Sequence, residues 1–158
     1  MRVPSEAPRQ LAPDAPEVPD VLALIRRAFA FMEARINPPS SMHRLSEASM
    51  RQQCSTGEVW VIGDPIKACI FLSDAPDALY LGKLAVEDAH RGAGLARQLV
   101  DLAEGRARDR GFAALVLEVR VELVENHAAF GAMGFVKTRE GAHDGFDHPT
   151  YIEMRKTL

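Results

Sequence analysis

The sequence predicts a mixed α/β domain in which helices and strands do not alternate regularly. Three observations support this prediction. The first half carries apolar residues at helical spacing, several short apolar runs bounded by turn residues have the length of strands, and a long amphipathic helix lies between strands in the second half. The expected order is helix, helix, three strands, helix, strand, helix and two strands.

Length and composition indicate one globular domain over residues 1–158. Hydrophobic residues make up 47% of the chain and charged residues 26%, as in an ordinary soluble protein. The net charge of −3, without a block of Lys or Arg, argues against nucleic acid as the main partner. No apolar run approaches the roughly 20 residues that span a bilayer, and the N-terminus lacks the apolar centre of a signal peptide. We therefore expect a cytoplasmic protein with no membrane partner.

The first residues predict an extended chain. Prolines are concentrated in residues 1–19, which suits an extended lead-in or an edge strand because proline cannot donate to a central ladder. Asp20 is the expected N-cap of a first helix, and Asn37-Pro38-Pro39 is expected to end it. The helical spacing of apolar residues predicts a buried face made of Val21, Leu24, Ile25, Ala28, Phe29 and Met32.

A second, shorter helix and three strands are expected next. Ser46 is the predicted N-cap of a helix that runs through Met50 to Gln53. Gly63-Asp64-Pro65 predicts a hairpin turn between the first two strands. The three strands are expected at residues 58–62, 66–72 and 78–86.

The second half predicts two more helices and three more strands. An amphipathic helix with Leu95, Leu99, Leu102 and Ala103 on one face is expected to end at Gly111. The continuous apolar run FAALVLEV has the length of a strand and predicts a central position in the sheet. The remaining elements are a helix from Asn126 to near Gly134 and closing strands at 135–138 and 150–155, around a polar loop at 140–149.

The stretch LAVEDAHRGAGLARQLV, residues 84–100, predicts a binding turn. Gly92 and Gly94 lie between a strand and a helix that lacks a side-chain cap. Closely spaced glycines let several amides point into one concavity, and the helix start adds its free amides and positive dipole end. Arg91 adds a positive charge, so the turn suits a phosphate or pyrophosphate.

Two other interpretations of this turn stay open. A lone G-x-G pattern also occurs in plain strand-to-helix turns. A dinucleotide-binding oxidoreductase has a similar turn, but Arg97 stands at the position of its third glycine.

The same stretch resembles the acetyl-CoA signature of the GNAT superfamily of N-acetyltransferases, Arg/Gln-x-x-Gly-x-Gly/Ala between a strand and a helix. Gly92 and Gly94 match, as do Arg91 and Ala96, whereas the first signature position is Ala89 and departs from the pattern. The resemblance continues through LVLEVR and ENHAAFGAMGF over the second half of the chain.

This resemblance implies the GNAT fold, a mostly antiparallel twisted sheet of about six or seven strands with about four helices, splayed at the acetyl-CoA site. It implies acetyl-CoA as co-substrate and direct acetyl transfer to a primary amine of a small molecule or peptide. No Cys-x-x-Cys or His/Cys cluster predicts a metal site. An acyl-CoA-binding or regulatory module without turnover stays open, and so does a homodimer, which no feature specifies.

The resemblance also assigns residues to acetyl-CoA. The glycine turn would hold the pyrophosphate, and the amides of the preceding strand would bind the pantetheine arm and the thioester. Phe130 would line the pantetheine tunnel. The expected acetyl-CoA-binding residues are Leu84, Ala85, Val86, Arg91, Gly92, Ala93, Gly94, Leu95, Ala96, Asn126 and Phe130.

Glu118 is the expected catalytic residue. A carboxylate within the apolar run LVLEVR is costly unless it is paired or functional. In GNAT members that acetylate protein N-termini, a matching Leu-Glu-Val-Arg segment supplies the base that takes the proton of the amine. An ion pair with Lys83 or Arg155 is the structural alternative.

The remaining expectations concern the leaving group and the acceptor. The resemblance predicts a tyrosine that protonates the departing thiolate, but Phe130 stands at that position and has no proton to give. The acceptor pocket is expected between the MEARINPPSS segment and the loop GAHDGFDHP before the last strand. The candidate acceptor contacts are Glu33, Arg35, His143 and Tyr151.

Overall fold

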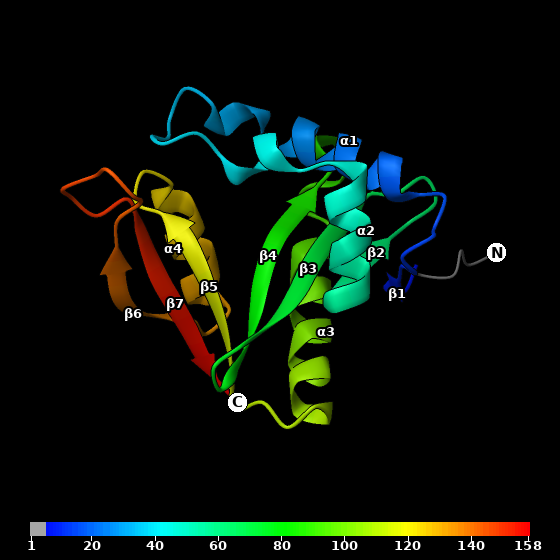
Figure 1. The fold of residues 1–158 in the computed structure, drawn as a ribbon. Coiled ribbons are helices and arrows are strands. Elements are labelled where there is room, and N and C mark those ends of the chain that lie inside the picture. The colour runs from blue at the N-terminus through cyan, green and yellow to red at the C-terminus, as the bar shows by residue number, and fades with distance from the viewer. Residues whose placement is uncertain (1–5) are drawn as a thin grey trace.

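A computed structural model describes residues 6–158, which form a seven-stranded open sheet with helices on both faces (Figure 1). The strands are β1 (Arg9–Gln10), β2 (Glu58–Ile62), β3 (Ala68–Ala75), β4 (Ala78–Val86), β5 (Ala114–Arg120), β6 (Val136–Gly141) and β7 (Tyr151–Thr157). The α-helices are α1 (Val18–Phe29), α2 (Glu47–Thr56), α3 (Leu95–Asp109) and α4 (Val124–Ala132). None of these helices has the length and apolar character that crossing a membrane requires.

The strand order is β1-β2-β3-β4-β5-β7-β6. All neighbouring strands run antiparallel except β4 and β5, which are parallel. The mixed, mostly antiparallel sheet with four helices is confirmed. It is not the doubly wound parallel sheet that the dinucleotide-binding alternative requires.

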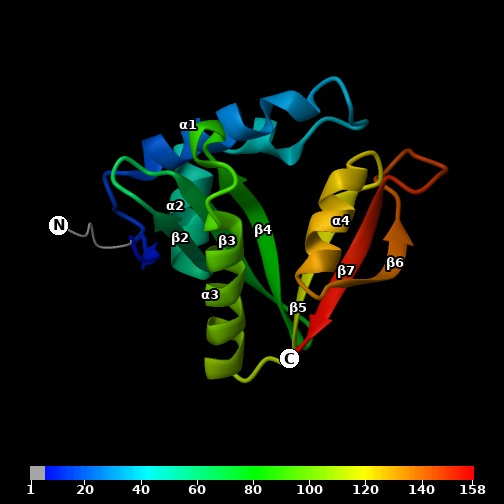
Figure 2. The same ribbon diagram turned by 180° about the vertical axis from the view of Figure 1, so that it is seen from behind.

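The helices form a layer on each face of the sheet. Helices α1 and α2 cover one face, and α3 and α4 lie on the other (Figure 2). The side chains of β3 alternate between these layers, as a strand's period of two dictates. Cys69 and Phe71 pack with α1 and α2, whereas Ile70 and Leu72 pack with α3. Two cores therefore hold the central strands from both sides.

A buried carboxylate fixes α3 against the sheet. Glu58 of β2 accepts hydrogen bonds from Arg106 Nε (2.8 Å) and Arg110 Nη1 (3.2 Å) of the α3 end, and from Trp60 Nε1 (2.7 Å). Burial alone would raise the pKa of Glu58, but the hydrogen bonds from Arg106 and Trp60 lower it. This network positions α3, and with it the glycine turn from which α3 begins.

The N-terminal segment differs in part from its prediction. The edge-strand expectation is confirmed for β1, which pairs antiparallel with β2; residues 1–5 of the predicted lead-in lie outside the described residues. Helix α1 begins at Val18, so Asp20 lies inside the first turn and is not the N-cap. Pro19 explains the earlier start, because proline suits the first helical turn.

The first helix also ends earlier than predicted. The α-helix ends at Phe29 and continues as a 3-10 turn over Ala30–Met32, well before Asn37. The predicted buried face is largely correct, since Val21, Leu24, Ile25 and Ala28 are buried. The prolines therefore shape the connection to α2 and do not terminate α1.

The other boundaries shift by a few residues. Ser46 caps α2 as predicted, in a reciprocal capping box with Ser49. Strands β2 and β4 have the predicted bounds, whereas β3 begins at Ala68 and β6 extends to Gly141. Helix α4 begins at Val124, so Asn126 lies within its first turn. The central position of β5 is confirmed, because it pairs with β4 on one side and β7 on the other.

The sheet opens between β4 and β5. These strands pair only where Leu79 and Tyr80 lie beside Leu115 and Val116, and beyond this point they diverge in a V (Figure 1). Strand β4 also carries a bulge, with Lys83 in the left-handed region at φ +48°. Along the diverging part, β4 therefore has a partner strand on its β3 side alone, and its other edge faces the opening.

Candidate active site

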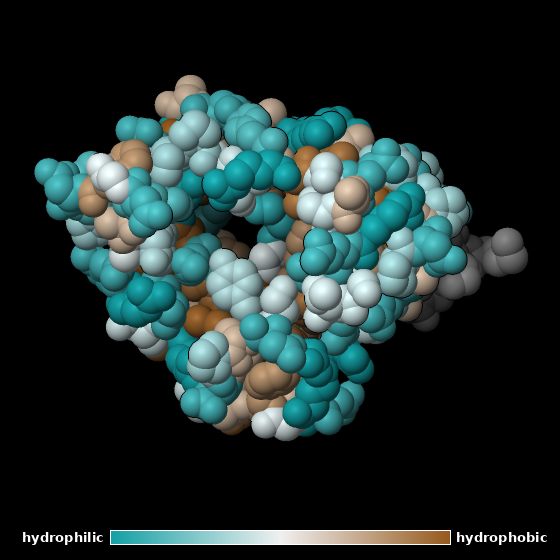
Figure 3. Space-filling view, in the orientation of Figure 1, coloured by the Kyte–Doolittle hydropathy of each residue, from teal (hydrophilic) through white to brown (hydrophobic). Residues whose placement is uncertain are grey.

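A cavity of about 860 Å³ lies between the diverging strands β4 and β5. Its volume suits a small-molecule or cofactor ligand. In the space-filling view it opens as a hollow in the face on which α1 and α2 lie (Figure 3). Its polar lining includes Ser40, Ser41, Arg44, Tyr80, Lys83, Glu118, Arg120, His143 and Tyr151.

The connection between α1 and α2 bridges this cavity from one side of the V to the other. Arg35 forms an ion pair with Glu125 of α4 and donates to the Glu122 carbonyl (3.1 Å). The Asn37 amide donates to the Glu122 carboxylate (3.1 Å). These contacts hold the Arg35 side chain outside the cavity lining. Arg35 therefore fastens the bridge and is not positioned to contact an acceptor.

Glu33 is likewise absent from the cavity lining. Its carboxylate lies 2.8 Å from Nε2 of His43, and both side chains are substantially exposed. His43 does line the cavity. Of the two acceptor contacts predicted in MEARINPPSS, neither reaches the cavity.

The glycine turn forms an open concavity at the start of α3. Gly92 and Gly94 adopt φ values of +81° and +80°, and a Cβ atom added to either would meet nothing within 4 Å. Within residues 6–158, the backbone amides from Gly92 to Arg97 donate no hydrogen bond to the protein. A row of free amides at the positive end of a helix is suited to bind an anion.

The Arg91 side chain lies next to this turn and contacts two neighbouring residues. Its Nε lies 3.0 Å from Asp88 Oδ1, and its guanidinium lies 5.6 Å from the ring centre of Phe31. The residues from Arg91 to Ala96 lie outside the cavity lining. The turn is therefore a second, adjoining part of the site, at the end of α3 nearest the top of β4 (Figure 2).

Glu118 and Arg120 lie on the opposite face of the sheet from the glycine turn. In β5, Leu117 and Val119 pack into the core that holds α3. Because successive side chains of a strand alternate between faces, Glu118 and Arg120 project to the side of α1 and α2. Helix α3 and its free amides lie on the other face, so an anionic ligand at the turn and a second ligand near Glu118 would approach from opposite sides.

Glu118 is a free carboxylate in the cavity. No side chain in residues 6–158 hydrogen-bonds to it, and it lies opposite Glu153 of β7. Partial burial raises the pKa of Glu118, the charge of Arg139 opposes this shift, and repulsion from Glu153 adds to it. The alternative ion pair with Lys83 does not form, because Lys83 Nζ donates to the Ser41 hydroxyl. Nor does Arg155 pair with Glu118.

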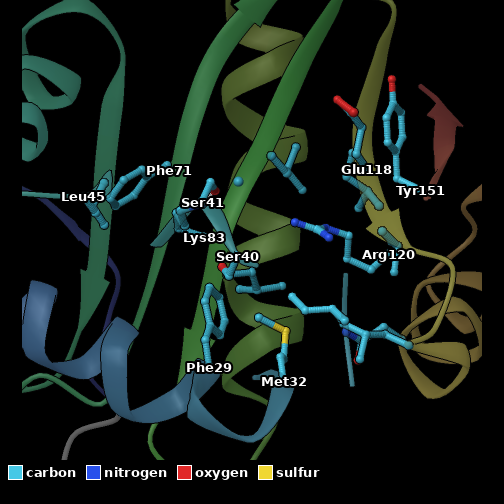
Figure 4. A pocket seen from close by; sticks show the side chains of 18 of the residues that line it. Phe29, Met32, Ser40, Ser41, Leu45, Phe71, Lys83, Glu118, Arg120 and Tyr151 are labelled. Atoms are coloured by element: carbon cyan, nitrogen blue, oxygen red, sulfur yellow. Dashed lines mark hydrogen bonds between the residues drawn. The ribbon is translucent and has the colours of Figure 1, made fainter. Parts of the chain in front are cut away.

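Tyr151 and His143 flank Glu118 in the cavity wall. Figure 4 shows the Tyr151 ring beside the Glu118 side chain. The His143 ring packs edge-on against Tyr151, with 5.4 Å between ring centres, and its Nδ1 bonds to the Thr150 hydroxyl. Burial lowers the pKa of His143, and the charges of Arg120 and Arg44 lower it further. Both residues therefore line the cavity, as their prediction requires.

The residues outside the glycine turn that are predicted to bind acetyl-CoA are brought together in part. Leu84, Asn126 and Phe130 line the cavity. Phe130 also packs edge-on against Phe135, with 5.8 Å between ring centres, so it belongs to the core as well as to the cavity wall. Ala85 and Val86 lie outside the cavity lining.

Several polar lining residues were not anticipated as site residues, among them Arg44, Tyr80, Lys83 and Arg120. Arg120 could have been found from the sequence, because it follows Glu118 by two residues and shares its face of the strand. Burial raises the pKa of Tyr80 to about 12, with a further contribution from the charge of Glu118. Arg44 lies in a 3-10 turn and Lys83 in the bulge of β4, and the sequence pattern predicts neither feature. Among residues 6–158, no group of acidic, His or Cys side chains is arranged to hold a metal ion.

Comparison with known proteins gives one family and many similar folds. The model of the acetyltransferase (GNAT) family matches residues 23–135. No curated protein matches the chain.

Among similar solved structures, PaiA N-acetyltransferase from Thermoplasma acidophilum in complex with coenzyme A has 14% identity, covers 98% of this chain and 100% of its own, and gives a TM-score of 0.80. IAA acetyltransferase from Bacillus cereus has 17% identity over 98% and 100% of the chains, with a TM-score of 0.67. The ribosomal-protein-S18-alanine N-acetyltransferase from Escherichia coli has 20% identity, covers 96% of this chain and 93% of its own, and gives a TM-score of 0.66. At these identities the likeness shows the fold.

Proposed function

Since the chain belongs to the acetyltransferase (GNAT) family, we propose that it transfers an acetyl group from acetyl-CoA directly to a primary amine. The observation that carries this proposal is the free Glu118 carboxylate in a cavity between diverging strands, opposite a turn with a row of free amides. A base and an anion cradle on two sides of one opening suit two substrates that meet between β4 and β5.

The residues of the glycine turn fit the pyrophosphate of acetyl-CoA. The amides from Gly92 to Arg97 have no protein acceptor within residues 6–158, and the missing side chains of Gly92 and Gly94 leave room for close approach. The open edge of β4 around Leu84 offers main-chain groups to the pantetheine arm and the thioester oxygen. When bound, acetyl-CoA supplies an acyl group that is activated by its thioester bond.

Glu118 would act on the acceptor. Its carboxylate takes a proton from the substrate ammonium, directly or through water, and leaves a neutral amine whose lone pair attacks the thioester carbonyl. The new C–N bond forms, the attacking nitrogen gives up a second proton, the C–S bond breaks, and the sulfur takes up a proton. A backbone amide of β4 near the carbonyl oxygen would stabilise the negative charge that develops there. The raised pKa of Glu118 suits a base that must accept this proton near neutral pH.

The first expected result concerns ligand identity. Acetyl-CoA at a hundredfold excess over its Kd should stabilise the native state by about 2.7 kcal/mol, because it binds that state alone. For a domain of this size the midpoint Tm should rise by about 5–10 °C in a thermal scan. NAD should produce no shift. A shift with NAD and none with acetyl-CoA would contradict the proposal.

The second expected result concerns Phe130, which stands where related enzymes place a thiolate-protonating tyrosine. Phe130→Tyr should change kcat by less than about tenfold, roughly 1.4 kcal/mol of barrier, because a thiol leaves readily without help. Initial rates at saturating acetyl-CoA measure the effect. A larger gain would mean that departure of the thiolate limits the rate and that the enzyme lacks a needed acid.

A further inference from the structure

Three cationic side chains meet on the acceptor side of the cavity. Arg44 lies at the end of the 3-10 turn Ser41–Arg44, Lys83 in the bulge of β4, and Arg120 at the end of β5. Figure 4 shows Arg120 extending from β5 into the space between the strands, towards the side on which Lys83 and Ser41 lie. We call Arg44, Lys83 and Arg120 the cationic cluster. Glu118 is the one carboxylate among the lining residues that the structure describes.

No carboxylate neutralises the cationic cluster within the described part of the chain. Lys83 Nζ donates to the Ser41 hydroxyl. Arg120 donates to two main-chain carbonyls, Pro38 O (2.6 Å) and Pro39 O (3.0 Å). Arg44 has no hydrogen-bond or ion-pair partner in residues 6–158. The hydrogen-bond partners of Lys83 and Arg120 are therefore neutral groups.

The surroundings make this arrangement unfavourable without a ligand. Burial lowers the pKa of Lys83, and the charges of Arg44 and Arg120 lower it further. Burial also lowers the pKa of Arg120, and Glu122 opposes that shift. Glu122 lies outside the cavity lining, where its carboxylate accepts the amide of Asn37. Lys83 and Arg120 are half-buried, whereas Arg44 is exposed. Cations partly withdrawn from water without a counter-charge are destabilising, so an anion bound at Lys83 and Arg120 would offset this cost.

The phosphates of acetyl-CoA are not the expected counter-charge. The free amides of the glycine turn begin α3, on the opposite face of the sheet from Arg120. Lys83 reaches Ser41 in the α1–α2 connection, which also lies on the Arg120 side. The cationic cluster therefore faces the second substrate.

We propose that the amine acceptor is a small molecule with a carboxylate or phosphate group in addition to its primary amine, and that Arg44, Lys83 and Arg120 bind this anionic group. The inference rests on the proposed function, because it assigns a chemical class to the acceptor of that reaction. Glu118 and Arg120 lie two residues apart on one face of β5, about 6–7 Å along the strand. One small acceptor can therefore place its amine at Glu118 and its anionic group at the cationic cluster.

Matched pairs of amines test this inference. The first pair is 4-aminobutyrate and butylamine, the second is O-phosphoethanolamine and ethanolamine, and the dication 1,4-diaminobutane serves as the opposite charge. We expect kcat/KM to be at least about tenfold higher for the anionic member of one or both pairs, and the favoured pair distinguishes carboxylate from phosphate. Calorimetry of the same amines with the CoA-loaded protein should give the same ranking without turnover.

Variants of the cluster sharpen the test. Arg44→Gln and Lys83→Gln should each raise KM for the anionic acceptor by about tenfold and change KM for its neutral partner by less than about twofold. Arg26→Gln, which removes an exposed charge of α1 outside the cavity, is the matched control and should change neither.

The outcomes separate this inference from the proposed function. Equal use of neutral and anionic amines, or equal loss for both in the variants, would overturn the anionic acceptor and leave acetyl transfer standing. Absence of turnover with every amine, together with selective binding of the anionic members, would overturn acetyl transfer and support the anion site. Absence of both turnover and selective binding would overturn both.

Discussion

Replacing Glu118 by Gln should lower kcat/KM for the amine acceptor by about 10²–10⁴-fold, the usual contribution of general-base catalysis. Gln keeps the shape of the side chain but cannot accept a proton from the ammonium. Acetyl-CoA affinity should change little, because Glu118 lies on the other face of the sheet from the glycine turn. Steady-state rates give the first quantity, and calorimetry with acetyl-CoA gives the second. Glu140→Gln, on the exposed strand β6, is the control for removal of a carboxylate.

The pH dependence gives an independent check on Glu118. A base acts in its deprotonated form, so its activity is present above its pKa and is lost as the pH falls through that value. Because partial burial raises the pKa of Glu118, the acid limb of kcat/KM should lie at higher pH than an ordinary glutamate would give. The Glu118→Gln variant should lose this limb.

The stability of the Glu118→Gln variant follows from the same shift. A raised pKa means that the fold disfavours the ionised carboxylate, so the substitution removes no stabilising charge at neutral pH. The variant should therefore melt at or above the temperature of the unchanged protein. Activity near that of the unchanged protein, with the acid limb retained, would show that Glu118 is not the base.

The second large effect is expected at the glycine turn. Gly94→Val should abolish detectable acetyl-CoA binding in calorimetry while the protein remains folded. Gly94 adopts φ +80°, where a β-branched residue is strained, and its side chain would project into the space beside the free amides. Both the distorted turn and the added bulk would exclude the pyrophosphate.

Gly111→Val is the matched control for this strain. Gly111 also adopts φ +80°, and a Cβ atom added to it would meet nothing within 4 Å. It follows the C-terminal end of α3, whereas the glycine turn precedes the N-terminal end of the same helix. Each substitution should therefore cost roughly 1–2 kcal/mol of stability for the left-handed conformation. Only Gly94→Val should lose acetyl-CoA. If Gly94→Val bound acetyl-CoA as tightly as Gly111→Val, the turn would be structural only.

The sequence predicts most of the fold because its patterns are local. Ser46 caps α2 as predicted, and the short apolar runs between turn residues give the bounds of β2 and β4 correctly. Errors fall where one local signal competes with another. Helix α1, with Pro19 in its first turn, begins at Val18, two residues before the apparent cap at Asp20. The prolines after Asn37 belong to the bridge over the cavity, whose path depends on contacts with α4.

The site is predictable where it depends on main-chain geometry and less so where side chains meet. The glycine spacing at Gly92 and Gly94 indicates a turn with free amides, and the structure has that turn. The outward position of Arg35 depends on its ion pair with Glu125, ninety residues later in the chain, which no local pattern reveals. The meeting of Arg44, Lys83 and Arg120 likewise depends on three distant elements.

The most direct test of acetyl transfer is to measure both products of one reaction. The protein is incubated with acetyl-CoA and an amine, free thiol is titrated, and the amine is analysed by mass spectrometry. We expect free CoA and acetylated amine in equal amounts, with much slower formation of both in Glu118→Gln. Thiol release without acetylated amine, or tight acetyl-CoA binding with neither product across neutral, anionic and dicationic amines, would contradict the account and identify a binding module without amine transfer.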